Sequence, residues 1–536
     1  MATPREPDNA IEVFPLPQDI RAERDVAVTM PDGTRLSANV FLPEATGALP
    51  VVLALTPYDK DVDVRELAER SIVRRKKIGL GMGRYKISDS TPFEAPDPAY
   101  WVRAGYAVVH VDLRGRGKSQ GKAKPYSRTE IQDYYHIVEW AGSQPWSNGR
   151  VALHGVSYLA IVQWYVAAAP PPQLVAIVPW EGNSDRYRDV MFHGGVPETA
   201  FFRGWQRNMD PESVQESPAE GPSRTPPISE VRGNPARLEQ IQVPALICGS
   251  YSDQGLHTKG CFDAFKRIGS QHKFLYTHGR GKWTVYYSED ALAYQRRFLD
   301  HFLKGADNGM DREPPVRLEV RRTIDSYDVR AESDWPLPRT QYRKAALDAA
   351  TRTLSFDAPR TESRLDYDSN AERGASFELK FDRATELTGH MKLALSVSTD
   401  AGDDLDLLVG IEKLDASGDV VHFEGRENDT HGLVSNGWLR VSHRELDPAR
   451  SMPWQPVLKH ERVQLVKPGE IVTVEIEILP SSTRFEAGEG LRLLISGKDV
   501  FSNAMHHHRE TCNAGRHTIY TGGKYDSHLL LPVIPD

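Results

Sequence analysis

A serine, an aspartate and a histidine stand at or just after the ends of three apolar stretches typical of buried strands. Ser157 follows RVALHGV (150–156), Asp253 comes shortly after PALICGS (244–250), and His278 ends HKFLYTH (272–278). A serine hydroxyl becomes a good nucleophile when a histidine takes its proton and a carboxylate orients that histidine. The sequence therefore predicts a catalytic triad in which Ser157 is the nucleophile, Asp253 the acid and His278 the base.

Each member of this triad has competitors in the sequence. Ser157 could instead be an ordinary N-cap of the helix that begins at Tyr158. Asp263 lies within a helical pattern, where a solvated role is expected. His257 comes early in the loop after Asp253 and His272 begins a strand, so both are weaker candidates for the base than His278.

An oxyanion that develops on a substrate carbonyl needs hydrogen-bond donors fixed in advance. The backbone N–H of Tyr158, directly after the nucleophile, is one candidate. Tyr58, in VVLALTPYDK after an earlier strand, is the second, because its phenol O–H could donate. The competing interpretation of Tyr58 is a tyrosine packed at a strand end.

These residues need a scaffold that brings strand ends together, and the first 310 residues have the pattern of one. Apolar runs alternate with helical patterns, as in a doubly wound α/β sheet. A hairpin is expected around Asp32-Gly33. The expected strands are 50–55, 106–112, 150–156, 174–180, 244–250 and 272–278, and the expected helices are 129–142, 158–169 and 261–269.

The alternation lapses between Trp180 and Val243 and ends near residue 313. The first change predicts an inserted, partly helical cap, since long unstructured loops are unusual. The second leads into strands with alternating apolar residues, such as 390–399 and 471–479, which favour a β-sandwich or jelly roll. The expected organisation is 1–182 and 242–312 for the α/β-hydrolase domain, 183–241 for the cap, and 313–536 for the jelly roll.

Several longer segments resemble one family, the cocaine-esterase and X-Pro dipeptidyl-peptidase-like (CocE/NonD) hydrolases, over essentially the whole chain. They are TPYDK, WVRAGYAVVHVDLRGRGKSQG, EWAGSQPWSNGRVALHGVSYLA, GSYSDQG, THGRGKW, WPLPRTQY, LTGHMKLALSVS and GWLRVSHREL. The resemblance implies an α/β-hydrolase fold with a helical cap and a C-terminal jelly roll. It also implies ester or amide hydrolysis through an acyl-enzyme on Ser157, with Asp253, His278 and Tyr58 in the roles given above.

The sequence departs from that family in three places. Ala160 replaces the glycine of the family's G-x-S-Y-x-G turn, and a methyl group in a tight contact can cost about 1–3 kcal/mol if nothing moves. Tyr251 and Ser252 precede the acid where a tryptophan is common. THGRGKW replaces a segment that usually contains Gly-Pro-Trp, which suggests a sub-branch with its own substrate.

Aromatic residues after Trp180 are candidates for an apolar acyl or alcohol pocket, or alternatively for the cap's own core. They are Trp180, Tyr187, His193, Phe201, Phe202 and Trp205. The expected substrate is a small carboxylic ester, or an amide. A dipeptidyl-peptidase or α-amino-acid ester hydrolase would need an anionic site for an ammonium group, for which Glu181, Asp185 and Glu198 are available. A non-catalytic protein that binds through its jelly roll is the alternative from another class.

Composition and charge bear on the binding partners and the location of the protein. The 536 residues carry a net charge of −8 and 26% charged residues, which disfavours a nucleic-acid or anionic-membrane partner. Neither an apolar spanning run nor a signal peptide is recognisable, and three cysteines without metal spacing favour a reduced, cytoplasmic location. We expect no cofactor and no metal, and a homo-oligomer is possible.

Three motifs imitate other sites. DLRGRGKSQG (112–121) lacks the first glycine of a phosphate loop, so we expect a turn after a strand. His506, His507 and His508 are adjacent and cannot easily converge on a metal, so a surface loop is expected. DDLDL (403–407) is interpreted as the solvated start of a hairpin rather than a calcium site.

Overall fold

The computed structural model describes residues 6–44, 47–209, 225–230, 235–501 and 503–535. A central sheet has the order β2-β3-β6-β4-β7-β8-β11-β12-β13-β14, with parallel pairing from β6 through β13. Its strands are β2 (Ile20–Thr29), β3 (Arg35–Pro43), β4 (Leu49–Thr56), β6 (Ala107–Asp112), β7 (Ser147–Val156), β8 (Leu174–Trp180), β11 (Ala245–Ser250), β12 (Lys273–His278), β13 (Val316–Arg321) and β14 (Tyr327–Glu332).

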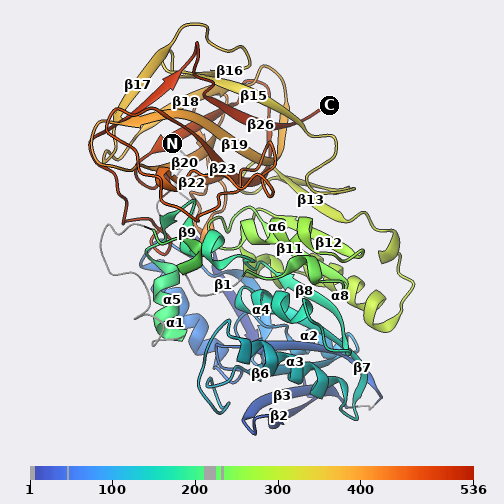
Figure 1. The fold of residues 1–536 in the computed structure, drawn as a ribbon. Helices are drawn as coiled ribbons and strands as arrows, with labels where there is room; N and C mark the ends of the chain where they lie inside the picture. Colours follow the sequence, from blue (N-terminus) through green and yellow to red (C-terminus); the bar gives the residue numbers. More distant parts are fainter. Residues whose placement is uncertain (1–5, 45–46, 210–224, 231–234, 502, 536) are drawn as a thin grey trace.

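Helices follow these strands and cover the sheet (Figure 1). The middle strands are apolar on both faces and fully buried, as expected for parallel strands between helical layers. The predicted strands and helices of this domain are confirmed to within a few residues. The helices are α1 (Val64–Lys76), α2 (Pro98–Arg103), α3 (Arg128–Gly142), α4 (Tyr158–Ala167), α6 (Thr258–Arg267), α7 (Lys282–Tyr286) and α8 (Glu289–Lys304).

One two-stranded element was not predicted from the sequence. Strand β1 (Asn9–Phe14) pairs in parallel with β5 (Gly83–Ser88) as a separate two-stranded ribbon. The segment after β6 forms the predicted turn: Gly115 and Gly117 both have positive φ, and a Cβ at 117 would lie 2.2 Å from Asp112 Oδ2.

The described residues of the inserted segment between β8 and β11 form only short elements. The segment contains a π-helical turn (Tyr187–Met191), β9 (Phe192–His193), β10 (Val196–Pro197), α5 (Phe201–Met209) and 3₁₀ turns at Ile228–Glu230 and Leu238–Gln240. Parts of the predicted cap, residues 210–224 and 231–234, lie outside the described residues. Val190, Phe202 and Leu256 form a small apolar cluster that packs this segment onto the loop after β11.

The C-terminal part is a β-domain with its own hydrophobic core. The predicted strands 390–399 and 471–479 are confirmed within two long strands, β19 (Thr385–Thr399) and β23 (Val472–Phe485), which pair antiparallel with each other. The strands are β15 (Gln341–Asp348), β16 (Thr353–Ser355), β17 (Ser363–Asp368), β18 (Ala375–Lys380), β19 (Thr385–Thr399), β20 (Asp406–Leu414), β21 (Val420–Val421), β22 (Ser435–Arg440), β23 (Val472–Phe485), β24 (Gly490–Ser496), β25 (Arg516–Thr521) and β26 (His528–Ile534). Three 3₁₀ turns accompany this part of the chain, at Met310–Arg312, Arg426–Asn428 and Val441–His443.

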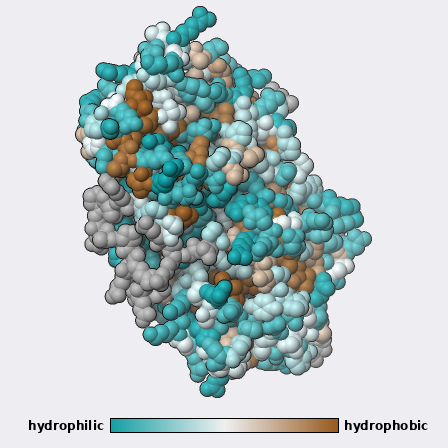
Figure 2. All heavy atoms as spheres, in the orientation of Figure 1, coloured by the Kyte–Doolittle hydropathy of each residue, from teal (hydrophilic) through white to brown (hydrophobic). Residues whose placement is uncertain are grey.

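The two domains are joined through strand pairing as well as through the chain. Strand β13 pairs with β12 of the central sheet and contacts β23 of the C-terminal domain at Arg321 and Thr483. Figure 1 shows the C-terminal strands against the end of the α/β domain where β9 and α6 lie. The visible face is largely hydrophilic, with separate hydrophobic patches (Figure 2). Among the described residues, no helix is long and apolar enough to cross a membrane.

Candidate active site

Ser157 lies on a sharp, strained turn between β7 and α4. Its φ is +56° and its ψ −117°, a conformation that costs a non-glycine residue about 1–3 kcal/mol. The N–H of Ser157 donates to the Trp180 carbonyl at 3.1 Å, which helps to fix the turn. Ser157 occupies the N-cap position of α4, but its side chain makes no capping hydrogen bond, so the hydroxyl does not serve as an ordinary cap.

Two small residues allow this turn. A Cβ at Gly155 would lie 2.5 Å from the Leu159 side chain, so only glycine fits where the strand meets the helix. Ala160 is fully buried, and a Cβ at Gly182 would lie 3.0 Å from its methyl group. The methyl group of Ala160 is therefore accommodated by a glycine on the loop opposite.

The base that contacts Ser157 is His257. Its Nε2 lies 3.2 Å from Ser157 Oγ, and its Nδ1 is hydrogen-bonded to Asp253 Oδ2. Asp253 and His257 are four residues apart in one turn just before α6, since the N–H of His257 donates to the Asp253 carbonyl at 3.1 Å. Gly255, with φ +77°, lets the turn pass close to His193 and Trp438.

His278 is not brought to Ser157, and the prediction that it is the base is not supported by the geometry. It ends β12 as expected, but it is fully buried and its Nε2 lies 3.0 Å from Glu181 Oε1. Its Nδ1 accepts the N–H of Arg280 at 3.2 Å. Both ring nitrogens are therefore engaged away from the serine.

The predicted acid occupies the expected position. Asp253 is 2% exposed, and its Oδ2 also accepts Lys282 Nζ at 2.9 Å. Burial alone would raise the pKa of this carboxyl, but Lys282 and His257 hold it well below the usual range. Asp263 lies on α6 and pairs instead with Lys259 and Lys266, at 3.2 and 2.8 Å.

The two predicted oxyanion donors adjoin the nucleophile. Tyr158 begins α4, so its N–H has no carbonyl in its own helix to bond. Tyr58 lines the same cavity as Ser157, with its ring edge-on to Phe93 at 5.3 Å. Burial and the nearby Glu94 raise the pKa of Tyr58, which keeps its phenol protonated and able to donate.

The cavity at Ser157 is lined mainly by apolar and aromatic side chains. The space between its walls, open solvent included, is about 310 Å³. Of the six predicted pocket residues, Phe201, Phe202 and Trp205 line this cavity. The sequence prediction missed Tyr126, Ile161, Asn183, Val190 and Leu256, which line it too.

The other three predicted pocket residues lie elsewhere. Trp180 is fully buried and stacks on His278, at 6.5 Å between ring centres. Tyr187 packs on Phe192 at 4.8 Å. His193 lies between the domains, where its Nδ1 is 2.7 Å from His508 Nε2.

The three acids considered for an ammonium group are all engaged. Glu181 accepts from Ser250 Oγ at 2.7 Å, as well as from His278. Asp185 pairs with Arg188 at 2.7 Å. Glu198 caps α5 by accepting the N–H groups of residues 200–202. None of these three acids lines the cavity at Ser157.

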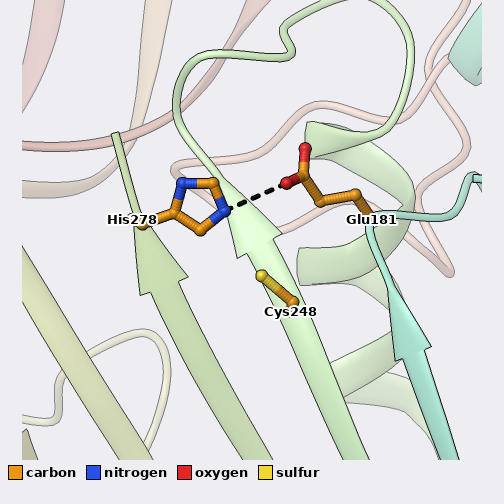
Figure 3. Close-up of side chains that lie close together, drawn as sticks. All are labelled: Glu181, Cys248 and His278. Atoms are coloured by element: carbon orange, nitrogen blue, oxygen red, sulfur yellow. Dashed lines mark hydrogen bonds and ion pairs between the residues drawn. The ribbon is translucent and has the colours of Figure 1, made fainter. Parts of the chain in front are cut away.

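Within the described part of the chain, two groups of side chains have ligand atoms close enough for a metal. Glu181, Cys248 and His278 are one (Figure 3), and Glu181, Asp253 and His257 are the other. In Figure 3 the Glu181 carboxylate, just after β8, points at the imidazole of His278 at the end of β12, with the strand of Cys248, β11, between them. Hydrogen bonds between the members explain both groups: Glu181 with His278, and Asp253 with His257.

The histidine run 506–508 is not the surface loop that the sequence predicted. His506 and His508 are 3% and 5% exposed, because this segment packs against the inserted segment. The ring of His506 stacks on Phe201 at 4.9 Å, and Thr199 donates its N–H to the His507 carbonyl at 2.9 Å. The run therefore helps to attach α5 to the C-terminal domain.

Comparison with known proteins gives a consistent result. Residues 32–283 match the X-Pro dipeptidyl-peptidase (S15 family) and residues 308–530 match the X-Pro dipeptidyl-peptidase C-terminal non-catalytic domain. A crystal structure of a CocE/NonD family hydrolase from Staphylococcus aureus is 40% identical, with a TM-score of 0.90 over 97% of this chain and 94% of that chain.

Two further relatives are more distant. Cocaine esterase from Rhodococcus sp. (strain MB1 Bresler) is 25% identical over 95% of this chain and 98% of its own length. An α-amino acid ester hydrolase is 15% identical with a TM-score of 0.69, covering 96% of this chain and 97% of that chain. At that identity the second likeness shows the fold alone.

Proposed function

Because this chain belongs to the CocE/NonD family of hydrolases, we propose that it hydrolyses a small carboxylic ester through an acyl-enzyme on Ser157. His257 takes the Ser157 proton as Oγ attacks the carbonyl carbon, and Asp253 stabilises the imidazolium. His257 then gives that proton to the departing alcohol. His257 deprotonates a water that attacks the acyl-enzyme, and then returns this proton to Ser157 Oγ as the bond to the acyl group breaks and the acid is released.

The hydrogen-bonded order Ser157–His257–Asp253 carries this proposal. It gives a base within reach of the nucleophile and a carboxylate that orients the base, which are the geometric requirements for covalent catalysis. A protein that only binds, through a C-terminal jelly roll, has no need of a strained serine at the end of a strand. We therefore favour an enzyme over a binding protein.

An ester is favoured over an α-amino-acyl substrate or a dipeptide by the lining of the cavity. An ammonium group in a buried site needs a paired charge. The described residues around Ser157 offer aromatic rings, aliphatic side chains and Asn183, but no carboxylate. The aromatic rings are suited to an apolar acyl or alcohol group.

Labelling with a fluorophosphonate tests the nucleophile. We expect one equivalent of label on the peptide that contains Ser157, because the reagent reacts with a serine activated by a base. The Ser157→Ala variant should remain folded and unlabelled. Labelling of another residue, or of none in the wild-type protein, would contradict the proposed function.

Replacing Tyr58 with phenylalanine tests the side-chain oxyanion donor. Loss of one such donor typically lowers kcat by about 10²–10³-fold. We expect that fall for Tyr58→Phe, with little change in thermal stability because the ring is retained against Phe93. A matched control is Tyr126→Phe, which removes a hydroxyl from the same cavity. Equal kcat values in Tyr58→Phe and wild type would show that Tyr58 has another role.

A further inference from the structure

The loop after β12 brings a buried lysine to the acid of the proposed triad. Lys282 is the first residue of α7 and is 6% exposed. Its Nζ lies 2.9 Å from Asp253 Oδ2. This loop is where the sequence analysis expected the catalytic base, so a permanent cation stands close to the position predicted for a histidine.

Both partners of Asp253 use the same oxygen. His257 Nδ1 and Lys282 Nζ are each hydrogen-bonded to Oδ2. Among the described residues, Oδ1 is buried and has no hydrogen-bond partner. The ammonium and the imidazole therefore share one carboxylate oxygen. The ammonium is charged whether His257 is neutral or protonated.

We propose that Lys282 is a positioning residue that fixes Asp253 as a charged anchor and makes His257 a weaker base. The ammonium orients the carboxylate while His257 is neutral. It also opposes protonation of His257, because the imidazolium would form beside a second cation. The enzyme then keeps its base active at lower pH than a triad without the lysine. This inference rests on the proposed function.

The charges around Lys282 keep it protonated. Burial opposes its charge, but Asp253, Glu427, Glu94 and Glu181 together hold the pKa of Lys282 above its usual range. Asp253 is the carboxylate among these that Lys282 contacts. Burial raises the pKa of Glu94 to about 8, so Glu94 is mostly uncharged at neutral pH.

The remaining two acids have other partners. Glu427 pairs with Arg75 at 2.7 Å. Glu181 is hydrogen-bonded to His278 and Ser250. The balance of charge near Asp253 therefore depends chiefly on Lys282 and His257.

The surroundings of His257 shift its pKa in both directions. Burial lowers the pKa of His257, the charge of Asp253 raises it, and the charge of Lys282 lowers it again. Glu181, after β8, raises it. From the C-terminal domain, Arg426 adds a further positive charge near Asp253. The net pKa of His257 lies below its usual value.

Contacts with the C-terminal domain hold the lysine in this position. A Cβ at Gly281 would lie 2.0 Å from Asn428 Nδ2, so the backbone before Lys282 fits closely against that domain. Asn428 is itself fixed by Glu424, at 2.6 Å. The approach of Lys282 to Asp253 is thus determined by packing on both sides of the loop.

The test is the pH dependence of kcat/KM for a chromogenic short-chain ester, and of the rate of fluorophosphonate labelling. A base acts when deprotonated, so a lower pKa of His257 keeps the rate high at lower pH. In Lys282→Met that pKa should rise, and the acidic limb should move upward by about one pH unit. Lys282→Arg keeps the charge and should keep the limb within about 0.3 unit of wild type. Lys259→Met is the matched control, since Lys259 is a largely buried lysine paired with Asp263 and Glu477.

The outcomes separate this inference from the proposed function. If wild type is not labelled at Ser157, the proposed function fails. If wild type is labelled but Lys282→Met has an unchanged acidic limb, the inference about Lys282 alone is overturned. If Lys282→Met does not fold, Lys282→Gln is measured in its place, with the same upward shift expected. An upward shift of the acidic limb in Lys282→Arg as well would contradict the proposed role of the positive charge at position 282.

Discussion

Replacing His257 with alanine should lower kcat by roughly 10⁵-fold or more, because Ser157 loses the group that takes its proton. Residual hydrolysis would come from substrate binding and the oxyanion donors. The change in thermal stability should be modest compared with this loss of kcat. Single-turnover kinetics on a chromogenic ester measure the loss directly.

His278 provides the matched control, since it is also buried and paired with a carboxylate, Glu181. We expect His278→Asn to retain kcat within about tenfold. Its main effect should be a lower free energy of unfolding, by about 1–3 kcal/mol, because a buried acceptor loses its donor. The opposite result, a severe loss of kcat in His278→Asn and none in His257→Ala, would restore the base predicted from sequence.

The second large effect is expected at Asp253. Asp253→Asn should lower kcat by about 10⁴-fold, because an amide neither selects the reactive tautomer of His257 nor stabilises its cation. The same change leaves Lys282 without its carboxylate, and breaking a buried ion pair costs about 3–5 kcal/mol. Stopped-flow kinetics and thermal unfolding would show the two effects together.

Asp263→Asn separates catalysis from general electrostatics. Asp263 lies ten positions further along the chain, on α6, and pairs with Lys259 and Lys266 rather than with a catalytic group. We expect its kcat to stay within about twofold of wild type. A comparable loss of activity in both variants would mean that the charge of this region, rather than the contact with His257, supports catalysis.

Much of the fold could be predicted from sequence because its signals are local. Strands such as β4 and β6 are apolar on both faces, and β23 alternates apolar with polar residues, so each pattern reports its own burial. The ribbon of β1 and β5 had no such signal. Its residues are mostly half-buried, and its pairing joins segments about seventy positions apart.

The candidate site was only partly predicted from the sequence. Ser157 and Asp253 follow from their positions after strands, whereas the order of strands favoured His278 as the base. The competing signal was the short spacing of Asp253 and His257, because a single turn closed by a hydrogen bond between residues four apart brings their side chains together. Phe201, Phe202 and Trp205 could be found from composition, but contacts of the fold decide which of the aromatic residues near the insertion face Ser157.

The single turn that carries both Asp253 and His257 has a consequence for the tolerance of this active site to change. Where acid and base lie on loops after two different strands, any slippage or relaxation between those strands alters the distance between the two groups. Here that distance is set within five consecutive residues, as one rigid unit. A change in the loop after β12 then leaves the acid–base distance intact, and what that loop alters, through Lys282, is the charge beside the pair.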